Sequence, residues 1–140
     1  MEDGRVTLIS KWKLRNGFPD ELRGKLKKLA DKVKKEQGTL MYLVNIQTCA
    51  PLDSYHKPIK PQPEPILPEL QSEVVFMEIY ENAEAFSRHV NGETFNEFRK
   101  NTLKYFQADP INAGWPITET EFFSLQSGFI KKGILAEVPV

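Results

Sequence analysis

The sequence predicts an α+β fold in which one antiparallel four-stranded sheet carries two helices on one face, the second of them broken. Two junctions indicate this fold. Residues 74–90 are typical of a strand that leads directly into a short helix, and residues 36–44 of a helix that ends at Gly38 and turns into a strand. Together they outline a strand–helix–strand plan that occurs twice in one chain.

Length and composition restrict the class of protein. A chain of 140 residues fits one domain, residues 1–140. Because 19 basic and 19 acidic residues cancel, charge gives no reason to expect nucleic acid or an anionic membrane as partner. Cys49 has no second cysteine to pair with, which favours a reducing compartment. No apolar run approaches the ~18 residues of a membrane span, and the start lacks signal-peptide features, so we expect a soluble, cytoplasmic protein.

The first half of the chain predicts a strand, a helix and a strand. Residues 5–14 alternate apolar and other side chains as a strand does. Pro19 suits the first turn of a helix, and leucines at helical spacing continue through residue 37, before Gly38 stops the helix in a left-handed conformation. The lysines of this helix alternate with acidic residues, which favours a solvated face over an anion site. Residues 39–47 form the second strand.

Residues 48–72 interrupt this plan as a Pro-rich insertion. Six of the ten prolines lie there, and their spacing excludes both a helix and a central strand. Apolar residues among the prolines favour a lid or arm that folds over the domain. A ligand segment for an SH3-type domain is the weaker interpretation, because no basic anchor lies in the usual place.

The second half predicts a strand, a broken helix and a strand. In strand 73–80 the residues Val75, Met77 and Ile79 face one side, opposite Val74, Phe76, Glu78 and Tyr80. Asn82 suits the N-cap of a helix that presents Phe86, His89 and Val90 together. Residues 94–97 form a capping-box pattern that restarts a helix through about Phe106. A last strand is expected at about 117–131, followed by an apolar tail at 132–140.

This order of elements is the split β-α-β arrangement of ferredoxin-like folds. Two helices cover only one face of such a sheet, yet the predicted strands are apolar on both faces. An exposed face of this kind would be a large apolar patch, which soluble monomers avoid. We therefore expect a homodimer formed by sheet-to-sheet packing, with a cover made by the Pro-rich insertion and the tail as the alternative.

Several segments together resemble one known family. Residues 36–42, 76–80, 85–89 and 94–98, in this order and spacing, are similar to the antibiotic biosynthesis monooxygenase (ABM) domain. The resemblance covers roughly residues 5–106, with 48–72 as an insertion. It implies a dimeric α+β barrel and, for some members, oxygenation of quinol-like aromatics without metal or flavin. Other members degrade haem, isomerise a small phosphorylated signal or have no established activity.

The haem-degrading branch fits this chain less well. Those members use an asparagine on the first strand together with a tryptophan and a histidine. Here the first strand offers Ser10 and Trp12 and no asparagine, and Tyr80 stands about where their tryptophan is expected. His89 is the residue that best matches the wider family's pattern.

The residues and the resemblance together suggest a site for cofactor-independent oxygenation. The substrate must donate an electron to O₂ itself, so the protein needs a dry pocket, a proton acceptor and polar groups that stabilise charge. An imidazole has a suitable intrinsic pKa for the proton step. The predicted catalytic residues are His89, Glu78 and Tyr80, and the predicted substrate-binding residues are Trp12, Tyr42, Asn45 and Phe86. No cofactor and no metal is expected, because two distant histidines and one cysteine do not make a zinc site.

Other interpretations remain open at this point. His89 is alternatively a hydrogen-bonded boundary residue, Glu78 a structural partner of Arg88, Arg99 or a backbone N–H, and the aromatic residues plain core. The corresponding functions are a non-catalytic or stress-related dimer that binds a small ligand, or an interaction domain whose Pro-rich arm holds a partner. Fold alone does not choose among these functions.

Overall fold

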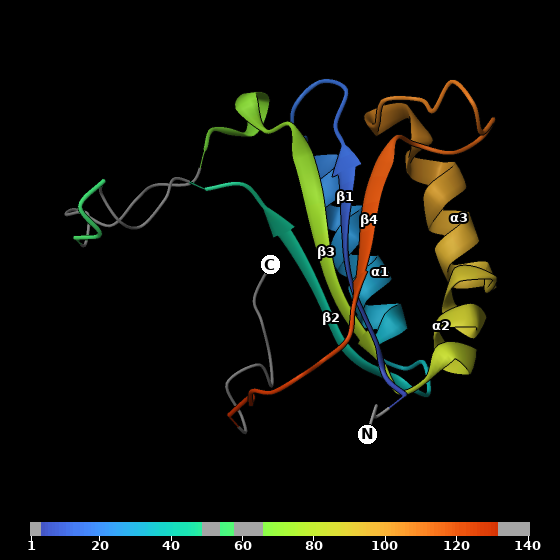
Figure 1. Ribbon diagram of the computed structural model, residues 1–140. Helices are drawn as coiled ribbons and strands as arrows, with labels where there is room; N and C mark the ends of the chain where they lie inside the picture. The colour runs from blue at the N-terminus through green and yellow to red at the C-terminus, as the bar shows by residue number, and fades with distance from the viewer. Residues whose placement is uncertain (1–3, 49–53, 58–65, 132–140) are drawn as a thin grey trace.

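The computed structural model describes residues 4–48, 54–57 and 66–131, and it shows an α+β fold with one four-stranded sheet (Figure 1). The strand order is β2-β3-β1-β4, and every neighbouring pair is antiparallel. The strands are β1 (Val6–Lys13), β2 (Thr39–Ile46), β3 (Glu73–Tyr80) and β4 (Thr118–Phe123). The helices α1 (Asp20–Val33), α2 (Ala83–Val90) and α3 (Glu93–Thr102) lie on one face, and short 3₁₀ turns span Pro68–Leu70 and Leu103–Tyr105. The predicted fold class is confirmed.

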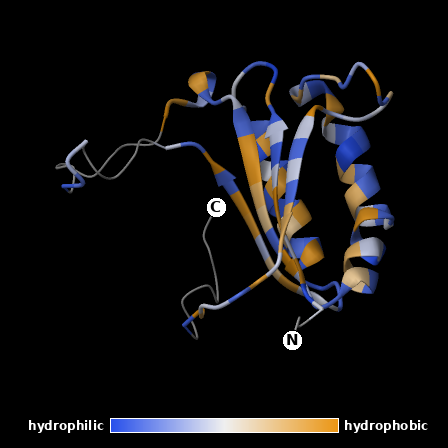
Figure 2. Ribbon diagram, viewed as in Figure 1, coloured by the Kyte–Doolittle hydropathy of each residue, from blue (hydrophilic) through white to orange (hydrophobic). Residues whose placement is uncertain are grey.

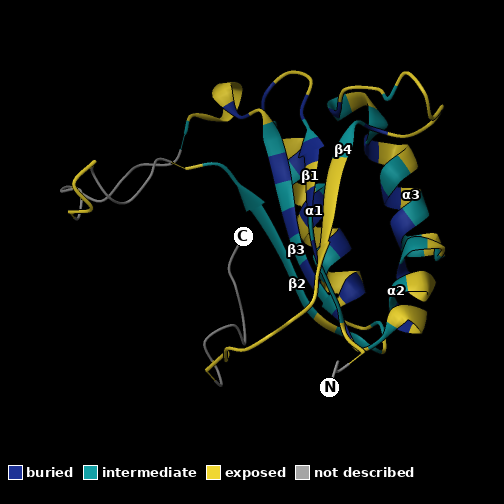
Figure 3. Cartoon of the chain, viewed as in Figure 1, coloured by how far each residue is buried: buried dark blue, intermediate teal, exposed yellow. Residues whose placement is uncertain are grey.

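The main core lies between this helical face and the sheet. Along β3, buried residues alternate with half-buried ones, and Val74, Phe76, Glu78 and Tyr80 are the buried set, as the alternation predicted (Figure 3). Phe76 packs in one cluster with residues of α1 and α3, which include Leu22, Leu26, Phe95 and Phe98. Burying such side chains stabilises the fold by about 1.5–3 kcal/mol each. This packing fixes the helices over the sheet and so defines the space for a site.

The two junctions that identified the fold also bring α2 against the turn after α1. Gly38 has φ +92°, and a Cβ built there would lie 2.6 Å from the Cβ of Ala85, so only glycine fits at this approach. The Asn82 side chain accepts a hydrogen bond from the Ala85 N–H at 2.9 Å and caps α2. The Asn82 cap is confirmed. Gly38 has the predicted left-handed conformation, but it lies in the turn before β2 and does not stop the helix, because α1 ends at Val33. The turn that contains Glu36 is therefore held beside the helix that carries His89.

Two predicted helix boundaries were wrong. Helix α1 ends at Val33 rather than at residue 37, because the N–H groups of Lys35 and Glu36 bond three residues back and tighten the chain into a turn. Helix α3 starts at Glu93 with Gly92 at its N-cap, so Thr94 lies inside the helix and the predicted capping box is absent. The helix then tightens into the 3₁₀ turn before Phe106.

The last strand is shorter than predicted. Strand β4 ends at Phe123, whereas the sequence suggested a strand to residue 131. The register explains the difference: Phe123 is paired with Thr7, next to the first residue of β1. Beyond that point the apolar residues of the sequence pattern, such as Phe129, have no ladder to join and are exposed.

The two ends of the Pro-rich insertion are tied together. The Gln71 side chain accepts from the Gln47 N–H at 2.8 Å and donates to the Gln47 and Ile66 carbonyls at 2.9 and 3.0 Å. Residues 49–53 and 58–65, with Cys49, and the tail 132–140 lie outside the described residues. The lid or arm role of the insertion therefore stays a prediction.

Much of β2 and β3 is hydrophobic (Figure 2), and the other face of the sheet is apolar across these strands, whereas the edge toward β4 carries Lys11 and Glu121 on that face. Met77 on β3 is paired with Leu43 on β2 and with Ile9 on β1, and all of them are half-buried. These residues form a row across three strands on the face that α1, α2 and α3 leave uncovered. In the described part of the chain, no helix has the length and apolar character needed to cross a membrane.

Candidate functional site

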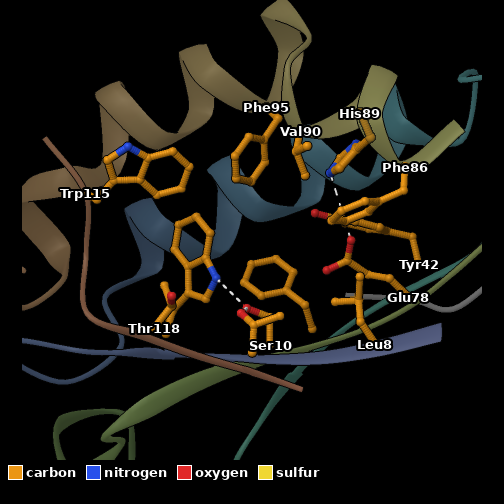
Figure 4. A pocket seen from close by; sticks show the side chains of 13 residues that line it. Leu8, Ser10, Tyr42, Glu78, Phe86, His89, Val90, Phe95, Trp115 and Thr118 are labelled. Atoms are coloured by element: carbon orange, nitrogen blue, oxygen red, sulfur yellow. Dashed lines mark hydrogen bonds and ion pairs between the residues drawn. The ribbon is translucent and has the colours of Figure 1, made fainter. Parts of the chain in front are cut away.

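A cavity of about 120 Å³ lies between the helical face of the sheet and helices α2 and α3 (Figure 4). Its lining includes most of the residues that the sequence singled out: Trp12, Tyr42, Glu78, Phe86 and His89. Tyr80 stands behind this lining and reaches it through a hydrogen bond to Glu78. Residues from β1, β2, β3 and α2 thus converge on one apolar space.

Asn45 does not belong to this group. Its side-chain amide donates to the Val75 carbonyl at 3.1 Å on the neighbouring strand, and Asn45 is not among the cavity residues. Tyr42 and Asn45 are three residues apart in one strand, so the alternation of β2 places them on opposite faces. The expected contact of Asn45 with a substrate is therefore corrected to a structural contact across the sheet.

His89 is buried and held at one ring nitrogen. Its side chain is 2% exposed, and Nδ1 lies 2.7 Å from Oε1 and 3.1 Å from Oε2 of Glu36. The other nitrogen, Nε2, faces the cavity side, with Oε1 of Glu78 at 4.0 Å. The rings of Tyr42, Tyr80 and Phe95 surround the imidazole at centroid distances of 5.5, 5.4 and 5.3 Å.

Glu36 is the residue that the sequence reasoning missed. The junction before Gly38 was recognised as a helix end, but nothing in its spacing showed which side chain would reach α2, fifty-three residues away. The available signal was the close approach that Gly38 permits. With Glu36 included, the site holds two carboxylates on either side of one imidazole.

Glu78 and Tyr80 form a buried pair. The Tyr80 hydroxyl donates to Oε1 of Glu78 at 2.5 Å, so neither Arg88 nor Arg99 partners this carboxylate. Burial raises the pKa of Glu78, against the opposing effects of the Tyr80 hydrogen bond and of His89. Burial and the negative charge of Glu78 raise the pKa of the Tyr80 phenol far above its ordinary value. Tyr80 is therefore a neutral donor that orients Glu78 rather than an acid that gives up its proton.

Hydroxyl groups line the other end of the cavity. The Trp12 indole N–H donates to Ser10 Oγ at 3.1 Å, and Ser10 Oγ lies 2.8 Å from Thr120 Oγ1 on β4. Thr118 also lines the cavity at this end, opposite Trp12 in the β1–β4 register. No pattern in the sequence could identify the threonines, because their position depends on how β4 pairs with β1.

Aromatic rings form the walls between these two ends. The ring centroid of Trp12 lies 5.2 Å from that of Phe76 and 6.0 Å from that of Phe95, and the centroids of Phe95 and Trp115 are 6.1 Å apart. Trp115 is 38% exposed, and the Arg99 guanidinium stacks 4.3 Å from its ring centre. Such walls suit a flat aromatic ligand. Among the described residues, no three His, Cys, Asp or Glu side chains are grouped so as to hold a metal ion.

The comparisons with known proteins concern the fold. No protein-family model matches the sequence, and no curated protein matches it. Solved structures do match. SnoaB from Streptomyces nogalater, a cofactor-independent oxygenase, superposes with a TM-score of 0.56 at 12% identity, over 91% of this chain and 99% of SnoaB. The chain has the same fold as SnoaB.

Two further structures support the same assignment. PA3566 from Pseudomonas aeruginosa superposes with a TM-score of 0.58 at 17% identity, over 91% of this chain and 99% of that chain. A conserved protein of unknown function from Bacteroides thetaiotaomicron, described as a possible oxidoreductase, gives a TM-score of 0.55 at 13% identity, over 88% and 99% of the two chains. At such identities the similarity shows the fold alone, and the chemistry of this chain depends on its own site.

Proposed function

We propose that this protein is a cofactor-independent monooxygenase that acts on a small hydroquinone-like aromatic, with His89 as its acid/base group. The observation that carries the proposal is the buried imidazole, held by Glu36 at Nδ1 and turned toward an aromatic cavity at Nε2. The fold shared with SnoaB, a cofactor-independent oxygenase, supports it.

The Glu36 contact decides which nitrogen of His89 acts as the base. A carboxylate accepts hydrogen bonds, so the neutral imidazole carries its proton on Nδ1, where it donates to Glu36. The lone pair then lies on Nε2, toward the cavity. When Nε2 takes a proton from a bound phenol, Glu36 and Glu78 both stabilise the imidazolium that forms.

The reaction that follows balances without a further reactant. The phenolate passes an electron to O₂, the two radicals combine to form a C–O bond, and the O–O bond then breaks as water leaves. Hydroquinone and O₂ give hydroxyquinone and water, so one oxygen atom enters the ring product and the other leaves as water. The ring loses four electrons and O₂ gains four. The protonated His89 returns its proton to the departing oxygen.

Oxygen consumption with a panel of single-ring hydroquinones tests this proposal. We expect His89→Gln to reduce the enzyme-dependent rate by about 10²-fold or more, because general base catalysis typically contributes 10²–10⁴-fold. His56→Gln is the matched control, because His56 is exposed in the described segment 54–57. Binding of the hydroquinone without any oxygen uptake would instead favour a non-catalytic ligand-binding protein.

We also propose that two copies pack through the uncovered face of the sheet. The row formed by Leu43, Met77 and Ile9 is apolar, spans three strands and lies opposite the helices. A second copy related by a two-fold axis would cover this row on both chains at once. At about 25 cal/mol per Å² of apolar surface, burying a few hundred Å² per chain supplies a strong driving force.

A further inference from the structure

We infer that the cavity selects a single-ring phenol that carries an oxygen acceptor on the opposite side of the ring. This inference rests on the proposed function for its reaction, but the selection itself is a property of binding. Three features of the cavity carry it: its volume, the hydrogen-bonding character of its two ends, and the place where it opens.

The volume limits the ligand to about one ring. The cavity measures about 120 Å³, and an apolar protein cavity of about 150 Å³ is known to hold benzene. The walls are rings of Trp12, Phe76 and Phe95, which cannot shrink as a flexible aliphatic chain can. The enclosed space is therefore of the order of one ring, and a fused second ring exceeds it.

One end of the cavity requires a hydrogen-bond donor on the ligand. Glu78 and His89 meet there, and Oε1 of Glu78 already accepts from the Tyr80 hydroxyl. In the neutral imidazole that acts as the base, Nδ1 donates to Glu36 and Nε2 has only a lone pair to offer. A ligand with a phenolic O–H satisfies this end, whereas an ether or a carbonyl placed here meets only acceptors.

The other end requires a hydrogen-bond acceptor. Ser10 and Thr120 bring two hydroxyl protons to their shared contact, and only one of them lies between the two oxygens. The Trp12 N–H donates to Ser10 Oγ and occupies a further lone pair of that oxygen. The Ser10 and Thr120 hydroxyls therefore have one O–H between them that is not used in their shared hydrogen bond. Thr118 adds another hydroxyl. A carbonyl or second phenolic oxygen of a ligand accepts from this end.

The strand register sets the distance between the two ends. Glu78 is paired with Leu8 on β1, and Ser10 lies two residues further along the same face. The separation is about 7 Å along the strand and about 5 Å across it, between backbones. Both side chains project from the same face of the sheet toward the helices, so the two polar groups border one cavity at separate points.

The opening of the cavity explains why a larger ring system gains no binding affinity. Trp115 and Thr120 border the cavity and are both exposed. A second fused ring would project past them into solvent, so it would add little buried apolar area and little affinity. The cavity therefore discriminates among single-ring ligands by their hydrogen-bonding groups, and additional rings do not increase the affinity.

Binding measured without turnover tests the inference. Redox-inert probes are titrated calorimetrically into the full chain: 4-hydroxybenzaldehyde, phenol, 4-methoxybenzaldehyde and 6-hydroxy-2-naphthaldehyde. We expect 4-hydroxybenzaldehyde to bind at least tenfold more tightly than phenol, which lacks the acceptor, and than the methoxy compound, which lacks the donor. The naphthaldehyde is expected to bind no more tightly than the single-ring probe.

A variant assigns the preference to the hydroxyl end. The combined replacement Ser10→Ala, Thr118→Val and Thr120→Val removes all three hydroxyls, and we expect the tenfold preference over phenol to disappear. Thr7→Val is the matched control, since Thr7 lies on the opposite face of β1. If the triple variant does not fold, as judged by thermal unfolding, the probe series with the wild type still decides.

Each outcome bears on the inference. Absence of binding by every probe, equal affinity for 4-hydroxybenzaldehyde and phenol, or tenfold tighter binding of the naphthaldehyde overturns it. These readouts are separate from oxygen consumption. Selective binding without oxygen uptake from hydroquinones would leave the inference standing and overturn the proposed function.

Discussion

Replacing Glu36 tests whether this carboxylate sets the proton chemistry of His89. The contact from Nδ1 to Oε1 is 2.7 Å, which is the length of a charge-assisted hydrogen bond. Such bonds contribute about 1.5–3 kcal/mol. Because the Glu36 side chain is 25% exposed, solvent weakens its charge, and we take the lower end of that range. A loss of about 1.5 kcal/mol corresponds to roughly a tenfold slower reaction.

Two replacements separate charge from geometry. Glu36→Gln keeps an oxygen that accepts from Nδ1 and removes the charge, so we expect about a tenfold lower rate of hydroquinone-dependent oxygen consumption. Glu36→Ala removes the acceptor as well, so we expect a larger loss and a change in the tautomer of His89. Nitrogen-15 NMR of the labelled imidazole reports the tautomer directly, and Glu97→Gln on the exposed side of α3 is the control.

Specific results would refute this reasoning. A wild-type imidazole that is protonated on Nε2 rather than on Nδ1 would contradict the assigned role of Glu36. So would a Glu36→Ala variant with an unchanged rate. If Glu36→Gln lost as much activity as Glu36→Ala, the charge would matter and the retained acceptor would not.

Three further predictions concern stability and assembly. Burial raises the pKa of Glu78, so the stability that its protonated form contributes is fully present below the unfolded-state pKa near 4.5 and is lost as the pH rises through the raised pKa. Glu78→Gln cannot ionise, so its Tm should rise relative to that of the wild type as the pH increases above 4.5. A difference in Tm that does not change with pH would contradict this. Gly38→Ala should lower the free energy of unfolding by about 1–3 kcal/mol, because residue 38 has a φ of +92° and a Cβ there would lie 2.6 Å from the Cβ of Ala85. At Gly114 the nearest atom to such a Cβ is 3.7 Å away, so Gly114→Ala should lower the free energy of unfolding by less in the same denaturant titration. Light scattering should show a dimer for the wild type and a monomer for Met77→Lys, and a monomeric wild type at micromolar concentration would exclude the proposed packing of the sheets.

Local patterns predicted those parts of the fold that depend on neighbouring residues. The alternation of β3 placed Phe76, Glu78 and Tyr80 on one face, and that face is the buried one. The left-handed conformation of Gly38 and the cap at Asn82 were recognised because each needs particular residue types, although Gly38 lies beyond the end of α1. Most of the predicted site residues lie on these elements, and the structure places them around one cavity.

The missed residues depend on contacts between distant parts of the chain. Glu36 reaches His89 only because the turn at Gly38 packs against α2, and Thr120 reaches Ser10 only through the β1–β4 register. The misplaced Asn45 had a local signal, since its distance of three residues from Tyr42 already put the two on opposite faces. The last strand was predicted too long for a related reason. An apolar pattern forms a strand only where a partner strand continues beside it, and β1 offers no partner beyond the pairing of Phe123 with Thr7.

We propose that oxygen from O₂ is transferred to an aromatic substrate in this cavity, with His89 as the proton acceptor. Mass spectrometry of a single-ring hydroquinone reaction under ¹⁸O₂ tests it most directly, in the protein stripped with chelator and checked for absence of flavin absorbance. We predict one ¹⁸O atom in the hydroxyquinone and one in water, with the His89→Gln variant far slower. Unlabelled quinone with hydrogen peroxide as the reduced product, or equal labelling with and without the imidazole, would contradict the account.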